Sequence, residues 1–340
     1  QARGMARKQQ GLTSQSQSDL EKPLAAGEKH QDHALIAEAQ MYLGWVESTS
    51  GHEHEAFSRI PAAMDQARRA GNIRLLGNAT GNLGTIHHRA GRIQDALAAY
   101  EKAAEILTDG GFRTSAAIFI SNVGVIRVQE RQHDSARAAF EQARSISHEF
   151  GERRREAVAG GYLAATYHDA CDFVGARDAY LQALPLLRES GDQFFEGLFR
   201  GYLGVLHHEI GETLHAEVAF TESIAILSAI GDTRLAALFR GFLGGLKAEQ
   251  DPEAAAKLLA GASAELAPMN APFLSLAVEL CVGQLEVVRA RQAGDTDLLS
   301  TARARVTRAQ AGAPSAADQS DEVRMALRLL EASLKNVGPA

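Results

Sequence analysis

Residues 201–223 read GYLGVLHHEIGETLHAEVAFTES, and the pattern in this stretch returns along the chain at intervals of 40 residues. Four of its positions have equivalents at this interval along the chain: Gly204, Ala216, Phe220 and Ser223. Each set of equivalent positions forms one column of the repeat. Counterparts of Gly204 are Gly44, Gly84, Gly124, Ala164 and Gly244. The other three columns contain Ala56, Ala96, Ala136 and Ala176, then Ile60, Tyr100, Phe140 and Tyr180, then Ala63, Ala103, Ala143 and Ala183. Agreement of several independent columns predicts a repeat protein.

Each 40-residue repeat predicts two helices. Leu203 and Leu206 flank the anchor Gly204 at helical spacing, and the later columns stand at i, i+4 and i+7, which is one stripe of a second helix. Glycines at 71, 111, 151, 191 and 231, mostly followed by Asn, Glu or Asp, indicate where one repeat ends and the next begins. A single pair cannot bury its apolar stripe, so the pairs must stack.

A small anchor after leucine, followed by Ala, an aromatic residue and Ala at these offsets, resembles the tetratricopeptide repeat. The resemblance covers residues 34–262 well and extends more loosely to 336. It implies an all-α fold, a right-handed superhelical solenoid of about seven antiparallel helix pairs with a C-terminal capping helix. The 40-residue interval is longer than the usual 34. Long repeats of this kind resemble those in the sensory arms of bacterial signalling proteins.

The sequence divides into four segments. Residues 1–30 are polar and poor in aliphatic side chains, so we expect a disordered tail. The repeats occupy 31–262, a divergent terminal helix pair is expected within 263–311, and 320–336 predict an amphipathic helix that caps the last repeat. The first residue is Gln rather than Met, so we expect a fragment or a processed product, with further domains or a homo-oligomer possible.

His208-Glu209-Ile210-Gly211-Glu212 differs by one residue from the H-E-x-x-H motif of zinc hydrolases. The repeat explains it without a metal: His208 and Glu209 end a first helix, Gly211 forms the turn, and Glu212 begins the second helix. The glycine breaks the single helical face that a zinc site of this type needs. We therefore predict no metal site, no cofactor and no catalytic residue, because no nucleophile, base and orienting group recur together.

The resemblance places a ligand-binding groove on particular columns of each first helix. The expected groove residues are Trp45, Thr85, His88, Arg89, Val125, Gln129, His168, Asp169, Val205, His208, Glu209 and Glu249. Three residues before the anchor stand small residues such as Gly81, Gly161 and Gly201, which we expect to leave an open floor for an inserted helix or extended peptide.

The predicted function is non-catalytic binding of a protein or peptide, as the sensing or scaffolding arm of a bacterial signalling protein. A small-molecule or signal-peptide sensor whose superhelix changes shape is the alternative, and a metal-dependent enzyme is the less favoured third. The net charge of −7 argues against general nucleic-acid binding. No run of eighteen apolar residues occurs, so no membrane span is expected. Two widely spaced cysteines favour a reducing cytoplasm.

Overall fold

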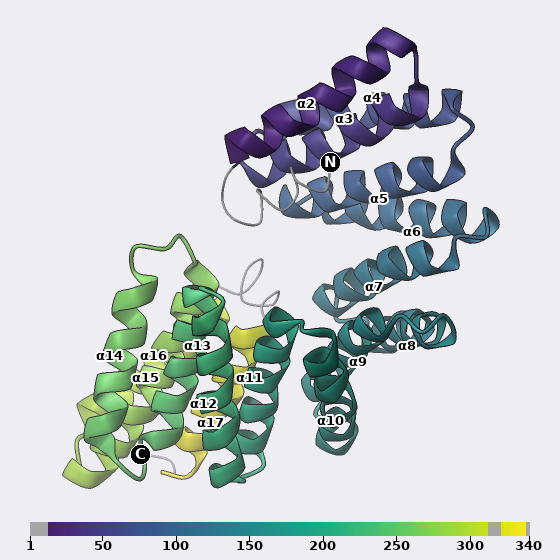
Figure 1. Ribbon diagram of the computed structural model, residues 1–340. Coiled ribbons are helices and arrows are strands. Elements are labelled where there is room, and N and C mark those ends of the chain that lie inside the picture. The colour runs from purple at the N-terminus through teal and green to yellow at the C-terminus, as the bar shows by residue number, and fades with distance from the viewer. Residues whose placement is uncertain (1–12, 312–320, 338–340) are drawn as a thin grey trace. The chain divides into compact units, whose positions relative to one another are not determined.

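The computed structural model describes residues 13–311 and 321–337, which consist of helices joined by turns (Figure 1). The chain forms two compact units. Unit 1 comprises Gln1–Arg127 and Ala138–Glu152, and unit 2 comprises Val128–Arg137 and Arg153–Ala340. The described part of each unit is a stack of antiparallel helices, and the prediction of an all-α repeat fold is confirmed.

The helices of the first half are α2 (Thr13–His30), α3 (His33–Thr49), α4 (Glu53–Arg69), α5 (Ile73–Arg89), α6 (Ile93–Asp109), α7 (Arg113–Gln129) and α8 (His133–Glu149). Those that follow are α9 (Arg153–Asp169), α10 (Phe173–Ser190), α11 (Gln193–Glu209), α12 (Thr213–Ala229), α13 (Thr233–Lys247), α14 (Pro252–Leu266), α15 (Pro272–Ala293), α16 (Thr296–Ala311) and α17 (Asp321–Lys335). The first helix of each repeat packs on the second, as α5 does on α6 and α11 on α12.

A left-handed turn ends the helices at regular steps of 20 residues. Its central residue has positive φ, and the glycines in that position are Gly51, Gly71, Gly91, Gly111, Gly151, Gly191, Gly211 and Gly231. The following residue often caps the next helix: the Asp192 side chain accepts a hydrogen bond from the Phe195 amide at 3.1 Å. The helix breaks therefore follow the repeat, and His208 and Glu209 do end α11 before the Gly211 turn.

Three of these turns use a residue other than glycine: Gln31, Arg131 and Cys171, whose φ values are 53°, 58° and 60°. A side chain in this region costs roughly 1–2 kcal/mol, which glycine avoids. We expect Cys171→Gly to raise the free energy of unfolding by about 0.5–1 kcal/mol, part of the gain being offset by the added freedom of the unfolded chain. Chemical denaturation measures this difference. Cys171→Ala keeps the strained backbone, so an equal gain from alanine would contradict the explanation.

The repeated aromatic residue packs within its own helix pair, on the anchor glycine. Phe220 is fully buried, and a Cβ added to Gly204 would lie 2.7 Å from its ring. Tyr100 on Gly84 and Phe140 on Gly124 repeat the arrangement at 2.8 Å. The alanine columns on either side are also buried. This close approach of two helix backbones explains why the anchor must be small.

The glycines that precede each anchor by three residues do not form an open floor, contrary to the sequence interpretation. An added Cβ at Gly161 would lie 2.0 Å from the Phe199 ring, and one at Gly81 would lie 2.0 Å from the Phe119 ring. Gly201 receives Phe239 in the same way, at 2.3 Å. Each of these three glycines thus accepts an aromatic side chain from the first helix of the next repeat, whereas Gly241 faces Val278 of α15. These positions join neighbouring repeats.

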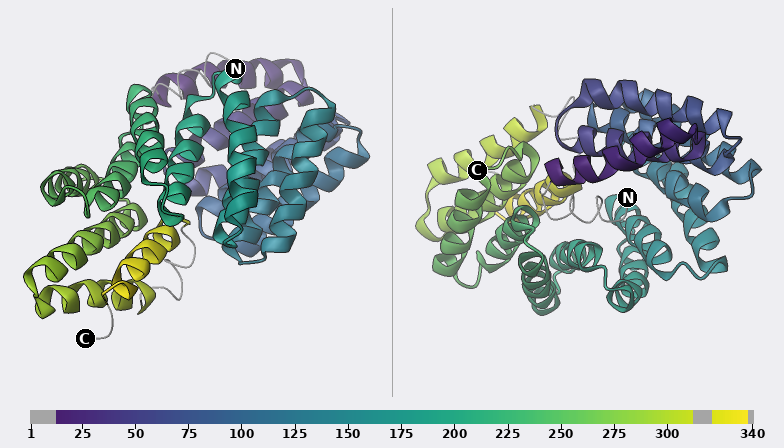
Figure 2. Two further views of the ribbon diagram at one scale, coloured as in Figure 1. Left: turned by 90° about the horizontal axis from the view of Figure 1, so that it is seen from below. Right: turned by 45° about the horizontal axis from the view of Figure 1, so that its top comes forward.

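Residues 13–30 form helix α2, so the expectation of a disordered tail over 1–30 is wrong for this part. Residues 1–12 lie outside the described residues. Leu20 is fully buried against Leu43 and Val46 of α3, with Leu24 and Trp45 beside them. The segment is polar apart from a few aliphatic side chains, and those are spaced to form a narrow apolar stripe. The contact of α2 with α3 is seen in Figure 2, where α2 is purple.

The last three helices depart from the 40-residue repeat. Helices α15 and α16 lie in the range predicted for a divergent pair, and α17 lies in the range predicted for a capping helix. Helix α17 packs on α15 and α16 and also reaches α9 and α11 of the same unit. Among the described residues, none of the helices has the length and apolar character needed to cross a membrane.

Candidate functional site

The expected groove columns of unit 1 are partly open. Thr85, His88 and Val125 are half-buried, and Arg89 is exposed. The Tyr100 hydroxyl donates a hydrogen bond to the Thr85 hydroxyl at 3.2 Å, which ties this column to the second helix of the pair. Trp45 departs from the expectation because it packs beside Leu20 and Leu24 of α2. Helix α2 therefore contacts the first groove position of unit 1.

The same columns in unit 2 are largely buried, and helix α17 covers part of them. His168 and Val205 are fully buried, and Asp169 is 9% exposed. The side chain of Glu209 is 6% exposed, and His208 is half-buried. Only Glu249, at the last expected position, is exposed, where it pairs with Arg291 of α15. Gln129, also in unit 2, is half-buried.

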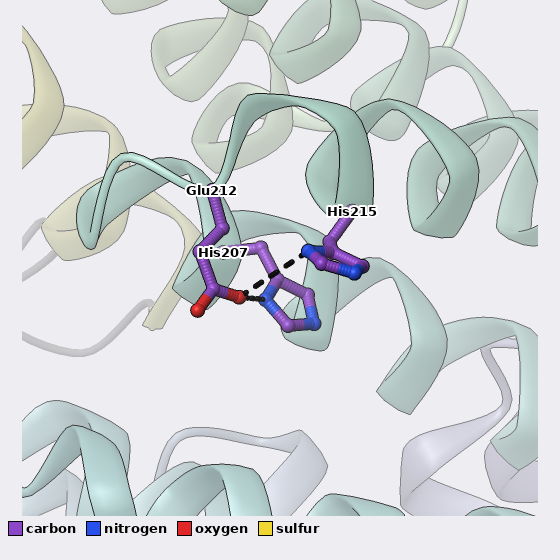
Figure 3. Close-up of side chains that lie close together, drawn as sticks. All are labelled: His207, Glu212 and His215. Atoms are coloured by element: carbon purple, nitrogen blue, oxygen red, sulfur yellow. Dashed lines mark hydrogen bonds and ion pairs between the residues drawn. The ribbon is translucent and has the colours of Figure 1, made fainter.

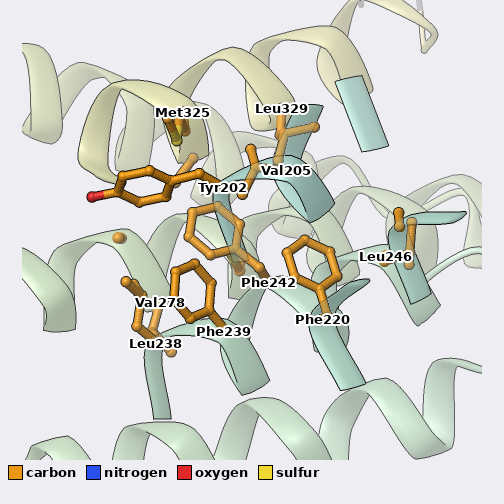
Figure 4. Packing of buried hydrophobic residues seen from close by; sticks show 14 of the residues in the cluster. Tyr202, Val205, Phe220, Leu238, Phe239, Phe242, Leu246, Val278, Met325 and Leu329 are labelled. Carbon is orange, nitrogen blue, oxygen red and sulfur yellow. The ribbon is translucent and has the colours of Figure 1, made fainter. Parts of the chain in front are cut away.

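Apolar side chains of α17 form the centre of this contact. Met325 and Leu329, 1% and 5% exposed, point from α17 toward Tyr202 and Val205 of α11 (Figure 4). Val205 belongs to the column directly after the anchor, which the sequence analysis assigned to the ligand. The position expected to contact a partner is therefore covered by an amphipathic helix of the same chain.

Two arginines of α17 pair with carboxylates of the groove. Arg324 Nε donates to Asp169 Oδ1 at 2.7 Å, and the Arg324 side chain is 9% exposed. One turn later, Arg328 Nη2 donates to Glu209 Oε1 at 2.9 Å. His133 and His168 flank the carboxylates, with His133 Nε2 3.6 Å from Asp169 Oδ2 and His168 Nε2 3.5 Å from Glu209 Oε2. Sequence analysis missed both arginines, because it assigned α17 to the end of the stack.

The electrostatics of Glu209 fit this pairing. Burial alone would raise the pKa of Glu209, but the neighbouring His168 imidazole and the Arg328 guanidinium lower it overall. Burial lowers the pKa of His208 to about 4, so this imidazole is neutral at physiological pH. At this position the groove of unit 2 thus presents a neutral imidazole beside the Glu209 carboxylate.

The carboxyl of Asp321, the first residue of α17, is in a less favourable environment than that of Glu209. Burial raises its pKa to about 7 from a usual value near 3.8; Arg324 opposes the rise, while Glu322 and Asp169 reinforce it. Glu322 lies beside it and accepts a 2.5 Å hydrogen bond from the Tyr202 hydroxyl. The first turn of α17 therefore adds two acidic groups to a face that is already acidic.

The raised pKa of Asp321 predicts a pH dependence for docking of α17. Between about pH 4 and pH 7, the Asp321 carboxyl is protonated when α17 is docked and ionised when α17 is undocked. Docking therefore weakens as pH rises through this window. Burial lowers the pKa of His208 to about 4, so its imidazole stays neutral between pH 6 and pH 8. We expect hydrogen exchange to show less protection of α17 at pH 8 than at pH 6, by about 1 kcal/mol after correction for intrinsic exchange. Asp321→Asn should remove the difference; the same pH dependence in that variant would contradict the assignment.

A second cluster of polar side chains lies at the turn between α11 and α12 (Figure 3). His207 Nδ1 is 2.6 Å from Glu212 Oε2, and His215 Nδ1 is 3.6 Å from the same oxygen. Burial lowers the pKa of His207, although the hydrogen bond to Glu212 opposes this, so the ring is neutral near pH 7. Neutral His and carboxylate are ligands that divalent metals accept, and these three could hold an ion. His208 and Glu209 are not part of this cluster; Glu209 pairs with α17.

The repeat architecture is that of known proteins, although no family model and no curated protein matches the sequence. RapI has 12% identity and a TM-score of 0.62, with 88% of this chain and 99% of that chain covered. A Rap protein complexed with competence and sporulation factor has 16% identity and a TM-score of 0.57, covering 95% and 98%. A signal-transduction ATPase with a tetratricopeptide repeat sensor from Pyrococcus horikoshii has 16% identity and a TM-score of 0.63, covering 78% and 41%. These likenesses show a tetratricopeptide-like fold.

Proposed function

We propose that this protein is a non-catalytic regulatory module of the bacterial cytoplasm that binds a helix or peptide of a protein partner on its groove columns. The observation that supports this most directly is helix α17, which is seated on those columns in unit 2. Its apolar residues contact Val205 and Tyr202, and its arginines pair with Asp169 and Glu209. A face that holds one amphipathic helix has the shape and chemistry to hold another.

The arrangement has the two ingredients of helix recognition in a groove. Apolar contacts at Met325 and Leu329 exclude water at the centre, and charge-assisted hydrogen bonds at either side fix the register of the helix. One of the similar structures is a Rap protein in complex with competence and sporulation factor, which is consistent with a ligand-binding role for this architecture.

Binding can be tested on the full chain after α17 is weakened. Met325→Glu with Leu329→Glu places two carboxylates in the buried contact, which should undock α17 while α15 and α16 remain packed. A fluorescent peptide with the sequence of residues 320–336, SDEVRMALRLLEASLKN, is then titrated and followed by anisotropy. We expect saturable binding to the variant that is at least tenfold tighter than binding to the unchanged protein.

The peptide carrying the same two substitutions is the matched control and should not bind. Hydrogen exchange must first show that the α17 amides of the variant are exposed while those of α11 stay protected. If the native-sequence peptide does not bind this variant, the groove of unit 2 is not a helix-binding site and the proposal fails.

A further inference from the structure

The docked α17 is held by a mixture of favourable and unfavourable charges. Among the described residues, four carboxylates and two guanidinium groups lie at this contact. The carboxylates are Asp169 of α9, Glu209 of α11, and Asp321 and Glu322 of α17, and the guanidinium groups are Arg324 and Arg328. Further titratable groups beside them are the imidazoles of His133, His168 and His208 and the phenols of Tyr162, Tyr180 and Tyr202. Two of these four carboxylates, Asp321 and Glu322, belong to α17 itself.

The acidic residues and the arginines of this helix therefore act against each other. Arg324 and Arg328, one turn apart, match the spacing of Asp169 and Glu209 on the groove. In the first turn, the Asp321 carboxyl shares the Arg324 guanidinium with Asp169, and the Glu322 carboxylate accepts a hydrogen bond from the Tyr202 hydroxyl. A helix that kept the arginines and lacked the two acids would pair the groove carboxylates fully.

We propose that the groove of unit 2 is a receptor for a basic amphipathic helix of a partner protein, and that α17 is a built-in competitor which this helix displaces. The partner helix carries two Arg or Lys residues one turn apart, with apolar residues beside them, and is not acidic in its first turn. This inference rests on the proposed function and specifies its ligand and its regulation.

Because α17 belongs to the same chain as the groove, it raises the partner concentration that is needed for binding. A tethered helix is present at an effective concentration of order millimolar, so a partner binds only in proportion to the fraction of protein in which α17 is undocked. The acids of α17 raise that fraction. A helix whose only task was to cap the stack would need apolar contacts alone, and its buried arginines and carboxylates would bring a desolvation cost without a role.

Two peptides test the inference on the unchanged full chain. The first is residues 320–336 with Asp321→Asn and Glu322→Gln, and the second carries in addition Arg324→Gln and Arg328→Gln. Binding is measured by anisotropy, and release of α17 by hydrogen exchange of its amides with the peptide present. We expect the first peptide to bind at least tenfold tighter than either the native-sequence peptide or the second peptide, and to deprotect α17 without deprotecting α15.

The groove carboxylates provide the matched variants. In the Met325→Glu, Leu329→Glu background, where α17 no longer competes, Asp169→Asn with Glu209→Gln should reduce the affinity for the first peptide at least tenfold, whereas Glu253→Gln, at an exposed position of α14, should leave it unchanged. Equal affinity for the peptides with and without arginines would overturn the inference, as would binding of the first peptide while α17 stays protected. Both results differ from failure of the proposed function, in which the native-sequence peptide does not bind even the variant with α17 undocked.

Discussion

Replacing Phe199 with alanine should lower the free energy of unfolding of unit 2 by about 3–5 kcal/mol. The Phe199 side chain is fully buried on Gly161, where an added Cβ would lie 2.0 Å from the ring. Its ring also lies among Tyr162 and Phe195, with centroid distances of 5.4 Å and 5.6 Å. Removing it leaves a cavity between two repeats. The close-packed helices around Gly161 cannot shift enough to fill that cavity.

Urea denaturation of the full chain, followed by fluorescence and circular dichroism, gives the change for Phe199→Ala. Leu214→Ala is the matched control, since Leu214 is 78% exposed on the same unit and should change stability by less than about 0.5 kcal/mol. Gly161→Ala extends the test: it should cost about 1–3 kcal/mol with Phe199 present and much less in the Phe199→Ala background. Additive effects would contradict direct packing of the ring on the glycine.

Replacing Arg324 with alanine should have the second largest effect, a loss of about 3 kcal/mol from docking of α17. The substitution leaves Asp169, which is 9% exposed, without its 2.7 Å hydrogen bond from a guanidinium group. Breaking a buried pair costs about 3–5 kcal/mol, because the remaining charge stays desolvated. The lower end applies here because α17 can undock and let water reach Asp169, which limits the loss to the free energy of docking.

Hydrogen exchange locates the effect of Arg324→Ala, which should fall on the amides of α17 and far less on those of α12. Arg177→Ala serves as the control because Arg177 and Asp178 form an exposed pair, with side chains 39% and 60% exposed and nitrogen and oxygen 3.9 Å apart. Such a pair contributes about 0–1 kcal/mol. Equal loss of protection in both helices would show that Arg324 supports the whole unit rather than docking.

Much of the fold could be predicted because its determinants are local. The stripe formed by Ala216, Phe220 and Ser223 lies on one helix, and the Gly211 turn depends on its own backbone. Helix α2 was missed because its few apolar residues stand in a polar segment, and burial of Leu20 depends on Leu43 in another helix. The role of Gly161 was misread for a related reason. A small residue is equally compatible with an open groove floor and with close packing of an aromatic ring against it.

The candidate site could be predicted from the sequence only in part. The resemblance could name the columns that contain Asp169, Val205 and Glu209, but not what covers them. Only the tertiary structure decided that α17 does, through a hydrogen bond between Arg324 and Asp169, residues 155 positions apart. The sequence by itself determined the helices, their turns and the stacking of pairs, because spacing along one chain encodes which face of a helix is apolar. It left open which apolar face meets which, because several amphipathic helices share that pattern and three-dimensional packing chooses between them.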